Sequence, residues 1–186
     1  MKPHPAALPI VVSLLAAACA TQPPPPYVAT TLQPTIGNSA AGTVWFIADG
    51  ADVRVRGRIT GLKANQEHGF HVHEKGDCSS ADAMSAGGHF NPTGKAHGAP
   101  SAEHHAGDLP ALRADAAGVA TLDSRVRGLG AGPGEFAGKA LVVHSNADDY
   151  TTQPTGNSGA RIACGVIAAT PPRDAAGQPL PLPRDI

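Results

Sequence analysis

The sequence predicts an all-β protein, an antiparallel β-barrel or sandwich. The 186 residues include 22 glycines and 18 prolines, and only 4% are aromatic, a composition that suits short strands and irregular loops better than a helical bundle. After the N-terminal segment no long stretch has helical periodicity, whereas short alternating segments recur between polar turns. The length indicates one domain with extensions at both ends.

The charge pattern excludes two classes of partner. Basic and acidic residues number 14 and 15, and no basic stripe indicates binding to nucleic acid or to a lipid surface. The unusual residue is histidine. Seven of the nine histidines fall between His68 and His105.

The N-terminus has the pattern of an export signal. Lys2 precedes a short apolar run, residues 6–18, which ends in Ala-Ala-Ala-Cys and is too short to span a bilayer comfortably. We favour a lipoprotein-type signal over residues 1–19, with Cys19 lipidated as the first mature residue, although Ala16 stands where leucine is usual. The alternative is an ordinary secretory peptide cut after Ala20. Both predict export to the periplasm, as a membrane-anchored or a free protein.

Residues 20–39 are expected to be a linker. They begin Thr-Gln-Pro-Pro-Pro-Pro after Ala20 and continue polar, which is typical of an extended spacer. The folded domain is therefore expected to start near Ala40 and to run to residue 170.

The first two predicted strands, residues 42–48 and 52–60, form a hairpin around Asp49-Gly50. In the second strand apolar residues alternate with three arginines, so one face should be buried and the other wet. Further strands are predicted at 69–74, 109–115, 118–126, 139–144 and 161–169. Of these, 109–115 and 118–126 are expected to form a hairpin around Ala116-Ala117-Gly118. Long polar loops occupy about 75–107 and the stretch after residue 144. Residues 171–186 form a tail with five prolines, expected to be loosely ordered.

Histidines and one aspartate form the candidate metal site. His71 and His73 lie two apart on a predicted strand, so both imidazoles project to the same side, away from Phe70 and Val72. Imidazole suits copper and zinc, and a carboxylate balances the charge of a divalent ion. Seven potential ligands predict two metals rather than one: His71, His73, His89, His97, His105, Asp108 and His144.

The three cysteines fit an exported protein. Lipidation or cleavage would account for Cys19. Cys78 and Cys164 would then remain as a pair able to form a disulfide in an oxidising compartment.

Several segments together resemble the copper/zinc superoxide dismutase family. They are GFHVHE (69–74), GGHFNP (87–92), KAHGAP (95–100), HAGDL (105–109), LVVHSNADD (141–149) and TGNSGARIACGVI (155–167), which cover nearly all of residues 40–169 in the expected order. The resemblance implies a Greek-key antiparallel barrel with long metal-binding and channel loops. It also implies disproportionation of superoxide to dioxygen and hydrogen peroxide, with copper and zinc as cofactors and a homodimer as one option.

The resemblance assigns roles residue by residue. His71, His73 and His144 resemble the copper ligands, His89 resembles the imidazolate that bridges copper and zinc, and His97, His105 and Asp108 resemble the other zinc ligands. Asp148 resembles the aspartate that orients a histidine of each metal. Arg161 resembles the arginine beside the copper, Thr155 a residue at the channel mouth, and Cys78 and Cys164 the disulfide.

The sequence departs from the animal enzymes at two places. Cys78 stands closer to His73 than in those enzymes, and no Lys or Arg lies between His144 and Arg161. Three other classes fit the residues less well. A copper-buffering protein would need no Arg161, a dinuclear hydrolase would use more bridging carboxylates, and an immunoglobulin-like adhesion module would have no use for seven converging ligands.

Overall fold

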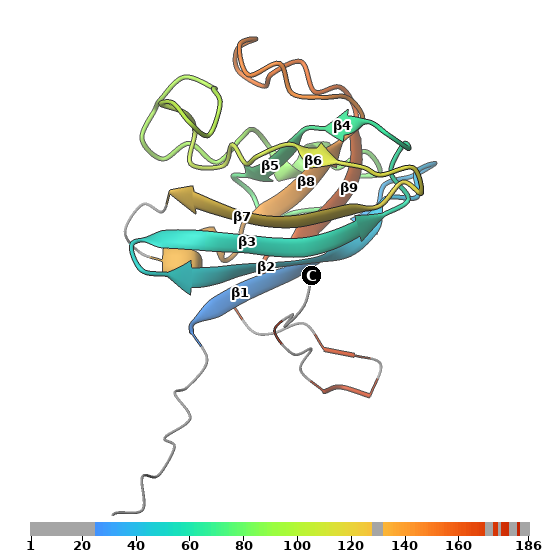
Figure 1. The fold of residues 1–186 in the computed structure, drawn as a ribbon, viewed down its shortest axis with the longest axis horizontal. Helices are drawn as coiled ribbons and strands as arrows, with labels where there is room; N and C mark the ends of the chain where they lie inside the picture. Colours follow the sequence, from blue (N-terminus) through green and yellow to red (C-terminus); the bar gives the residue numbers. More distant parts are fainter. Residues whose placement is uncertain (1–24, 128–131, 170–172, 175, 179–181, 183–186) are drawn as a thin grey trace, which may run out of the picture.

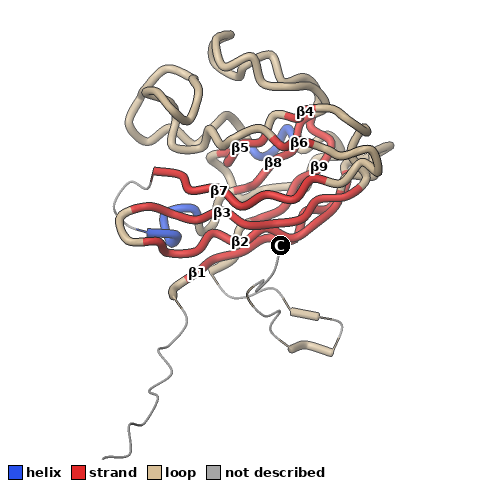
Figure 2. Tube along the Cα trace, viewed as in Figure 1, coloured by secondary structure: helices blue, strands red, loops and turns tan. Residues whose placement is uncertain are grey.

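The computed structural model describes residues 25–127, 132–169, 173–174, 176–178 and 182. Within these ranges the protein contains β-strands and two short 3₁₀ helices, η1 (Met84–Ala86) and η2 (Gly132–Phe136), but no α-helix (Figure 2). None of the described helices has the length and apolarity needed to cross a membrane. The predicted all-β class is confirmed.

One antiparallel sheet of seven strands curls into a half-barrel (Figure 1). Its order is β5-β8-β9-β1-β2-β3-β7, so the chain crosses over between β3 and β5 and again between β7 and β8, as in a Greek key. The seven strands are β1 (Tyr27–Pro34), β2 (Ala41–Asp49), β3 (Asp52–Thr60), β5 (Phe70–His73), β7 (Ala120–Arg127), β8 (Ala140–His144) and β9 (Arg161–Val166).

The linker prediction for residues 20–39 is wrong, because β1 lies within it. β1 pairs with β2 from Tyr27 to Leu32 and with β9 through Gln33 and Pro34, so it joins the two halves of the sheet. Val28 and Leu32 are in the main core, and Leu32 is 0% exposed. Burial of these side chains holds the segment in the sheet, and the folded domain therefore begins by Tyr27 rather than near Ala40.

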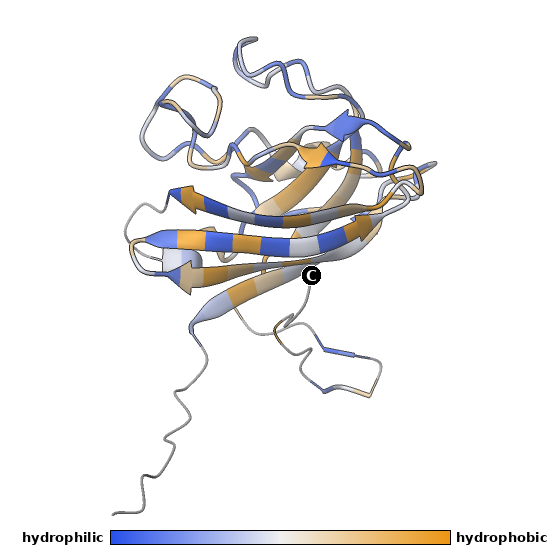
Figure 3. Cartoon of the chain, in the orientation of Figure 1, coloured by the Kyte–Doolittle hydropathy of each residue, from blue (hydrophilic) through white to orange (hydrophobic). Residues whose placement is uncertain are grey.

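The hairpin of β2 and β3 is confirmed. Its register runs from Ala41 opposite Thr60 to Asp49 opposite Asp52. Hydrophilic and hydrophobic residues alternate along β3 (Figure 3). The apolar side chains are buried, and the arginines alternate with them, so they lie on the opposite face. The alternation in the sequence therefore predicted both the strand and which of its faces is buried.

The second predicted hairpin is only partly correct. A turn does form, in which the Gly118 N–H donates to the Asp115 carbonyl. However, β6 (Leu112–Arg113) pairs with β4 (Glu67–His68) in a separate two-stranded sheet, while β7 pairs with β3. Leu112 is 1% exposed and packs in the main core, which draws this arm of the turn away from β7.

Two apolar clusters bury both faces of β8. The main core contains Leu141 and Val143 and includes the contacting rings of Phe46 and Phe136, whose centroids are 5.0 Å apart. A smaller cluster on the other face contains Ala140 and Val142 together with Ala83, Ala86 and Cys164. The loop that follows β5 therefore packs onto the outside of the sheet, where the predicted site lies.

Candidate metal centre

The β5 histidines point away from the main core but are not exposed. Phe70 and Val72 belong to that core, and alternation sends His71 and His73 to the other side of the strand. Strand alternation alone would leave this side open to solvent, yet His71 and His73 are both 0% exposed. They are buried because the long loop after β5 returns over this side of the strand. There the main chain of His89 pairs with that of His73, and the main chain of Asp108 with that of His71, as isolated β-bridges.

One group of four histidines surrounds a common point. The ligand atoms of His71, His73, His89 and His144 lie within 4.8 Å of one another, and all four residues are buried. His144 reaches this group at the end of β8, where a register irregularity follows Val143.

In three of these rings one nitrogen is fixed by an oxygen. His71 Nε2 donates to Asp148 Oδ2 at 2.5 Å, His73 Nδ1 to the Gly87 carbonyl at 2.9 Å, and His144 Nδ1 to the Gly159 carbonyl at 3.3 Å. These bonds set the tautomers and leave the second nitrogen of each ring as an acceptor.

The remaining nitrogens fit a metal. They are buried and have no hydrogen-bond partner: His71 Nδ1, His73 Nε2, His89 Nε2 and His144 Nε2. Unpaired buried polar atoms are costly, and four imidazole nitrogens form a donor set that suits copper. The residues present therefore fit the ion that the sequence predicted.

A second group is built around one carboxylate oxygen. Asp108 Oδ1 lies 2.8 Å from His89 Nδ1, 3.0 Å from His97 Nδ1 and 3.3 Å from His105 Nδ1. Its other oxygen accepts main-chain N–H groups from Gly98 and His105. Three imidazole nitrogens and one carboxylate oxygen form the kind of tetrahedral set that zinc takes.

The electrostatics of the two groups favour their metal-binding forms. Burial lowers the pKa of His71 to about 4, of His73 to about 2 and of His144 to about 3, so these rings are neutral at neutral pH. Burial alone would raise the pKa of Asp108, but the hydrogen bond from His89 and the neighbouring histidines hold it below its usual range. Neutral imidazole and ionised carboxylate are the forms that bind metal.

Asp148 connects the two groups. Its carboxylate accepts from His71 Nε2 through Oδ2 and from His97 Nε2 through Oδ1, the latter at 2.9 Å, and its side chain is 0% exposed. The sequence predicted this orienting position from the family resemblance. It did not predict Gly156, which has a φ of +66° and where a side chain would collide with the Asp148 carboxylate.

Other supporting residues also escaped prediction. The side-chain amide of Gln153 makes two hydrogen bonds to the main chain of His97. Its Oε1 accepts from the His97 N–H at 2.8 Å, and its Nε2 donates to the His97 carbonyl at 2.9 Å. The Gly87 carbonyl accepts from both His73 and Arg161. Nothing in a loop sequence marks a single amide or carbonyl for such a role, so no signal could have found them.

Arg161 lies beside the four-histidine group. Its guanidinium donates to the carbonyls of Ala83 and Gly87, both at 2.7 Å. It lines a pocket of about 590 Å³ together with His73, His144 and Thr155, which places the predicted channel residue at the same opening. Asp82 also lines this pocket, but among the described residues no carboxylate forms an ion pair with Arg161.

The predicted disulfide is present. Cys78 and Cys164 are bonded, with an S–S distance of 2.07 Å, and the bond attaches the loop after β5 to β9. Cys19 lies outside the described residues, as do the rest of the signal and most of the tail.

Two histidines outside the predicted set lie close to it. His68 is 1% exposed and donates from Nδ1 to the main-chain carbonyl of the ligand candidate His144 at 2.8 Å. His104 is half-buried and contacts the carbonyl of His105. The structure therefore selects His105 and not its neighbour for the second group, as the spacing to Asp108 predicted.

The fold and the site define a class: an antiparallel β-barrel with two adjoining buried groups of candidate metal ligands that share one histidine. Residues 40–167 match the family model described as copper/zinc superoxide dismutase (SODC), and the chain belongs to that family. Among solved structures it is similar to a crystal structure of the clock protein EA4. The two are 37% identical, the match covers 80% of this chain and 98% of that one, and the TM-score is 0.69.

Proposed function

We propose that this protein disproportionates superoxide to dioxygen and hydrogen peroxide. Copper would be held by His71, His73, His89 and His144, and zinc by His89, His97, His105 and Asp108, with His89 shared between them. Copper supplies a one-electron change of oxidation state, whereas zinc has no redox chemistry. Two superoxide anions and two protons yield one dioxygen and one peroxide, so atoms and charge balance.

The observation that carries the proposal is the placement of the two nitrogens of His89. Nδ1 lies 2.8 Å from Asp108 Oδ1, within the second group. Nε2 is buried without a partner and faces the first group. A single imidazole that offers one nitrogen to each group is the arrangement that a bridge between two metals requires.

The other residues have roles that follow from their contacts. Arg161 offers a fixed positive charge to a small anion in the pocket that also contains His73 and His144. Its two carbonyl contacts hold the guanidinium in place without neutralising it. His89 Nε2 is the atom at which a proton can be held near that anion, while Nδ1 remains engaged with the Asp108 group. Asp148 keeps the rings of His71 and His97 oriented throughout.

The first test is metal content together with activity. Protein loaded with copper and zinc should bind both ions and accelerate the decay of superoxide, and the metal-free protein should not. This experiment distinguishes a superoxide dismutase from a protein that binds the metals without catalysis. The distinction matters because a similar solved structure is that of a protein named as a clock protein. Full metal loading with no acceleration would refute the proposal.

A second test examines the bridge. Protein with copper in both sites should show magnetic coupling between the ions, because one imidazolate would connect them. His89→Ala should abolish the coupling while the far-ultraviolet circular dichroism stays that of the parent. His104→Ala is the matched control, since His104 is outside both groups. An uncoupled parent protein would show that His89 does not bridge.

We also propose that the protein acts in the periplasm. The signal-like N-terminus and the disulfide support this location, because disulfides persist in oxidising compartments.

A further inference from the structure

The outer face of β3, on the side opposite the main core, carries a row of three arginines: Arg54, Arg56 and Arg58. Two of them are neutralised from β7. Asp123 is opposite Arg56 in the register, and its carboxylate oxygens lie 2.6 Å from Arg54 Nε and 3.2 Å from Arg56 Nε. One end of the row is therefore paired with an acid.

Arg58, at the other end of the row, has no acidic partner. The residue opposite it on β7 is Thr121, and the residue opposite it on β2 is Thr43. Arg58 is exposed, and no carboxylate among the residues that the structure describes pairs with it. Its guanidinium therefore keeps its positive charge and its N–H donors for a ligand.

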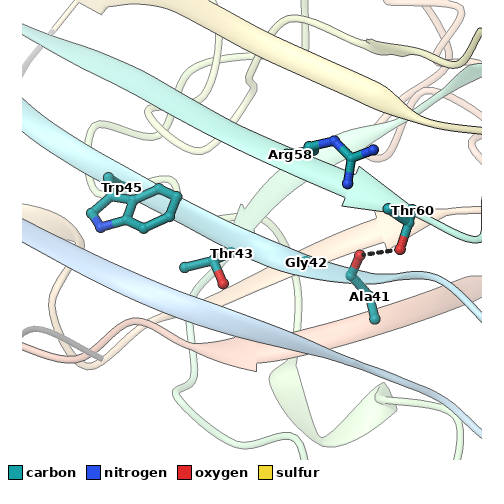
Figure 4. Close-up of a pocket in the computed structure, with 6 residues that line it drawn as sticks. All are labelled: Ala41, Gly42, Thr43, Trp45, Arg58 and Thr60. Atoms are coloured by element: carbon teal, nitrogen blue, oxygen red, sulfur yellow. Dashed lines mark hydrogen bonds between the residues drawn. The ribbon is translucent and has the colours of Figure 1, made fainter. Parts of the chain in front are cut away.

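Arg58 lines a pocket of about 400 Å³, a volume typical of small-molecule sites. Figure 4 shows the indole of Trp45 at one end of this pocket and Arg58 with Thr60 at the other, with Thr43 between them. Trp45 and Thr43 are partly buried and lie on the same face of β2. The full lining is Ala41, Gly42, Thr43, Trp45, Arg58 and Thr60.

Two hydroxyl groups belong to this lining. Thr60 Oγ1 donates to the Ala41 carbonyl at 3.4 Å, so its lone pairs remain able to accept. Thr43 Oγ1 makes no hydrogen bond within the described part of the chain. Both hydroxyls are therefore available to a ligand that carries hydroxyl groups of its own.

These groups specify the chemistry of a ligand. A guanidinium pairs with a carboxylate through two parallel hydrogen bonds. An indole offers a flat face of negative potential, against which the C–H groups of a sugar ring pack. A saccharide that carries a carboxylate, such as a hexuronic acid, presents the carboxylate, the C–H face and the hydroxyls together. Nucleic acid would need several unpaired cations, whereas Asp123 already pairs with both neighbours of Arg58 in the row.

We propose that this pocket binds a carboxylate-bearing saccharide, with the sugar ring against Trp45, its hydroxyls at Thr43 and Thr60, and its carboxylate at Arg58. The site is separate from the metal centre, because no lining residue belongs to either histidine group. Binding is therefore expected with or without metal, and it does not depend on the proposed activity.

Fluorescence provides a direct test, because Trp45 is the only tryptophan of the chain. The full chain is titrated with D-glucuronate and with trigalacturonate at constant pH and ionic strength. The emission should shift to shorter wavelength and the acrylamide quenching constant should fall, because the sugar ring covers the indole. D-Glucose, which has the ring but no carboxylate, should bind about threefold more weakly than glucuronate.

Substitutions localise the carboxylate. Arg58→Ala should raise the dissociation constant for glucuronate about threefold, as for the loss of an exposed ion pair, and should leave the constant for glucose unchanged. Arg54→Ala is the matched control, because it removes the same charge from the same face of β3 at a residue that does not line the pocket. The far-ultraviolet circular dichroism of both variants should stay that of the parent.

A capped triglutamate peptide tests the other class of anionic ligand, an acidic protein segment. It carries as many side-chain carboxylates as trigalacturonate but no sugar ring, so it should bind more weakly. Binding of the peptide as tight as that of trigalacturonate would overturn the proposal. So would the absence of any response of Trp45 to both saccharides, or an equal loss of glucuronate binding in Arg58→Ala and Arg54→Ala.

Discussion

The carbonyl of Gly87 couples two functional side chains at the candidate copper site. It accepts from His73 Nδ1 at 2.9 Å and from Arg161 Nη2 at 2.7 Å. The same oxygen therefore orients one ligand candidate and positions the only cation between Ser145 and Cys164. A change at Arg161 can act through its charge or through this tether, and an experiment must separate the two.

Arg161→Glu should lower the second-order rate with superoxide at least about tenfold, equivalent to roughly 1.4 kcal/mol. The reason is that the charge that attracts a small anion is reversed; superoxide dismutase is itself a known example of such electrostatic steering. Salt should slow the parent protein by screening, and the variant should lose that slowing. The measurement is pulse radiolysis across ionic strengths at equal metal content.

Two variants control this experiment. Arg161→Lys keeps the charge while losing the paired geometry of the guanidinium, so it should retain most of the salt dependence. Arg127→Glu makes the same change in net charge at a residue that does not line the pocket and should leave the rate near the parent value. Parental rate and salt dependence in Arg161→Glu would show that this side chain does not guide the substrate.

Asp108→Ala should reduce zinc retention and thermal stability more than it reduces copper binding. Asp108 Oδ1 is the atom shared by three histidine nitrogens, and its other oxygen fixes two main-chain N–H groups. Metal binding is coupled to folding, so the melting temperature should fall with zinc occupancy. Metal analysis and calorimetry test this, with Asp52→Ala on the surface of β3 as control. Unchanged zinc occupancy would exclude Asp108 as a ligand.

At the scale of residues, the sequence predicted the side chains with distinctive chemistry. Two histidines at i and i+2 and a histidine three residues before Asp108 leave a readable pattern, and the structure brings these residues together. Gly87 and Gln153 contribute through a carbonyl and an amide, which any loop contains. Their roles depend on the folded path of the chain, so no local pattern could have indicated them.

At the scale of elements, β1 determines how the sheet is closed. It pairs with β2 along most of its length and with β9 at its end, and without it the two halves would share no hydrogen-bonded strand. The sequence does not indicate this strand, because prolines precede it and polar residues surround a short alternating segment. Strands β2 and β3 were found because their alternation is long and regular.

Leu32→Ala is expected to destabilise the protein by about 2–5 kcal/mol, as for a large-to-small change in a packed core. Leu32 is 0% exposed, whereas the adjacent Thr31 is exposed. Thr31→Ala should therefore change the free energy of unfolding by no more than about 0.5 kcal/mol. Denaturant unfolding of both variants makes the comparison. If Leu32→Ala were as neutral as its neighbour, residues 27–34 would be a linker after all.

At the scale of the whole molecule, the metal centre lies between the barrel and a loop that is fastened at several points. The disulfide, the small apolar cluster beside β8 and the Arg161 contacts hold the loop after β5 onto the sheet. This covering buries histidines that strand alternation alone would have left wet. Burial by a distant loop is a tertiary effect, so strand alternation predicts on which side of β5 the histidines lie but not that they are buried.

The position of β1 also limits the distance between the domain and a membrane. If Cys19 carries lipid, only residues 20–26 separate it from Tyr27, the start of β1, so the two are eight positions apart in the chain. Eight positions span at most about 27 Å at full extension, much less than the linker 20–39 would have allowed. The domain would therefore remain close to the membrane surface.

Cys19→Ser should move the protein from the membrane fraction to the soluble periplasm. The reason is that serine removes the thiol that would carry the lipid, while the apolar run of residues 6–18 still directs export. Fractionation of parent and variant is the measurement, and mass spectrometry of the mature N-terminus distinguishes the two forms of the signal. Lipidated Cys19 as the first residue supports the anchor. A mature parent protein that begins at Thr21 and is already soluble would instead establish cleavage after Ala20 and a free periplasmic protein.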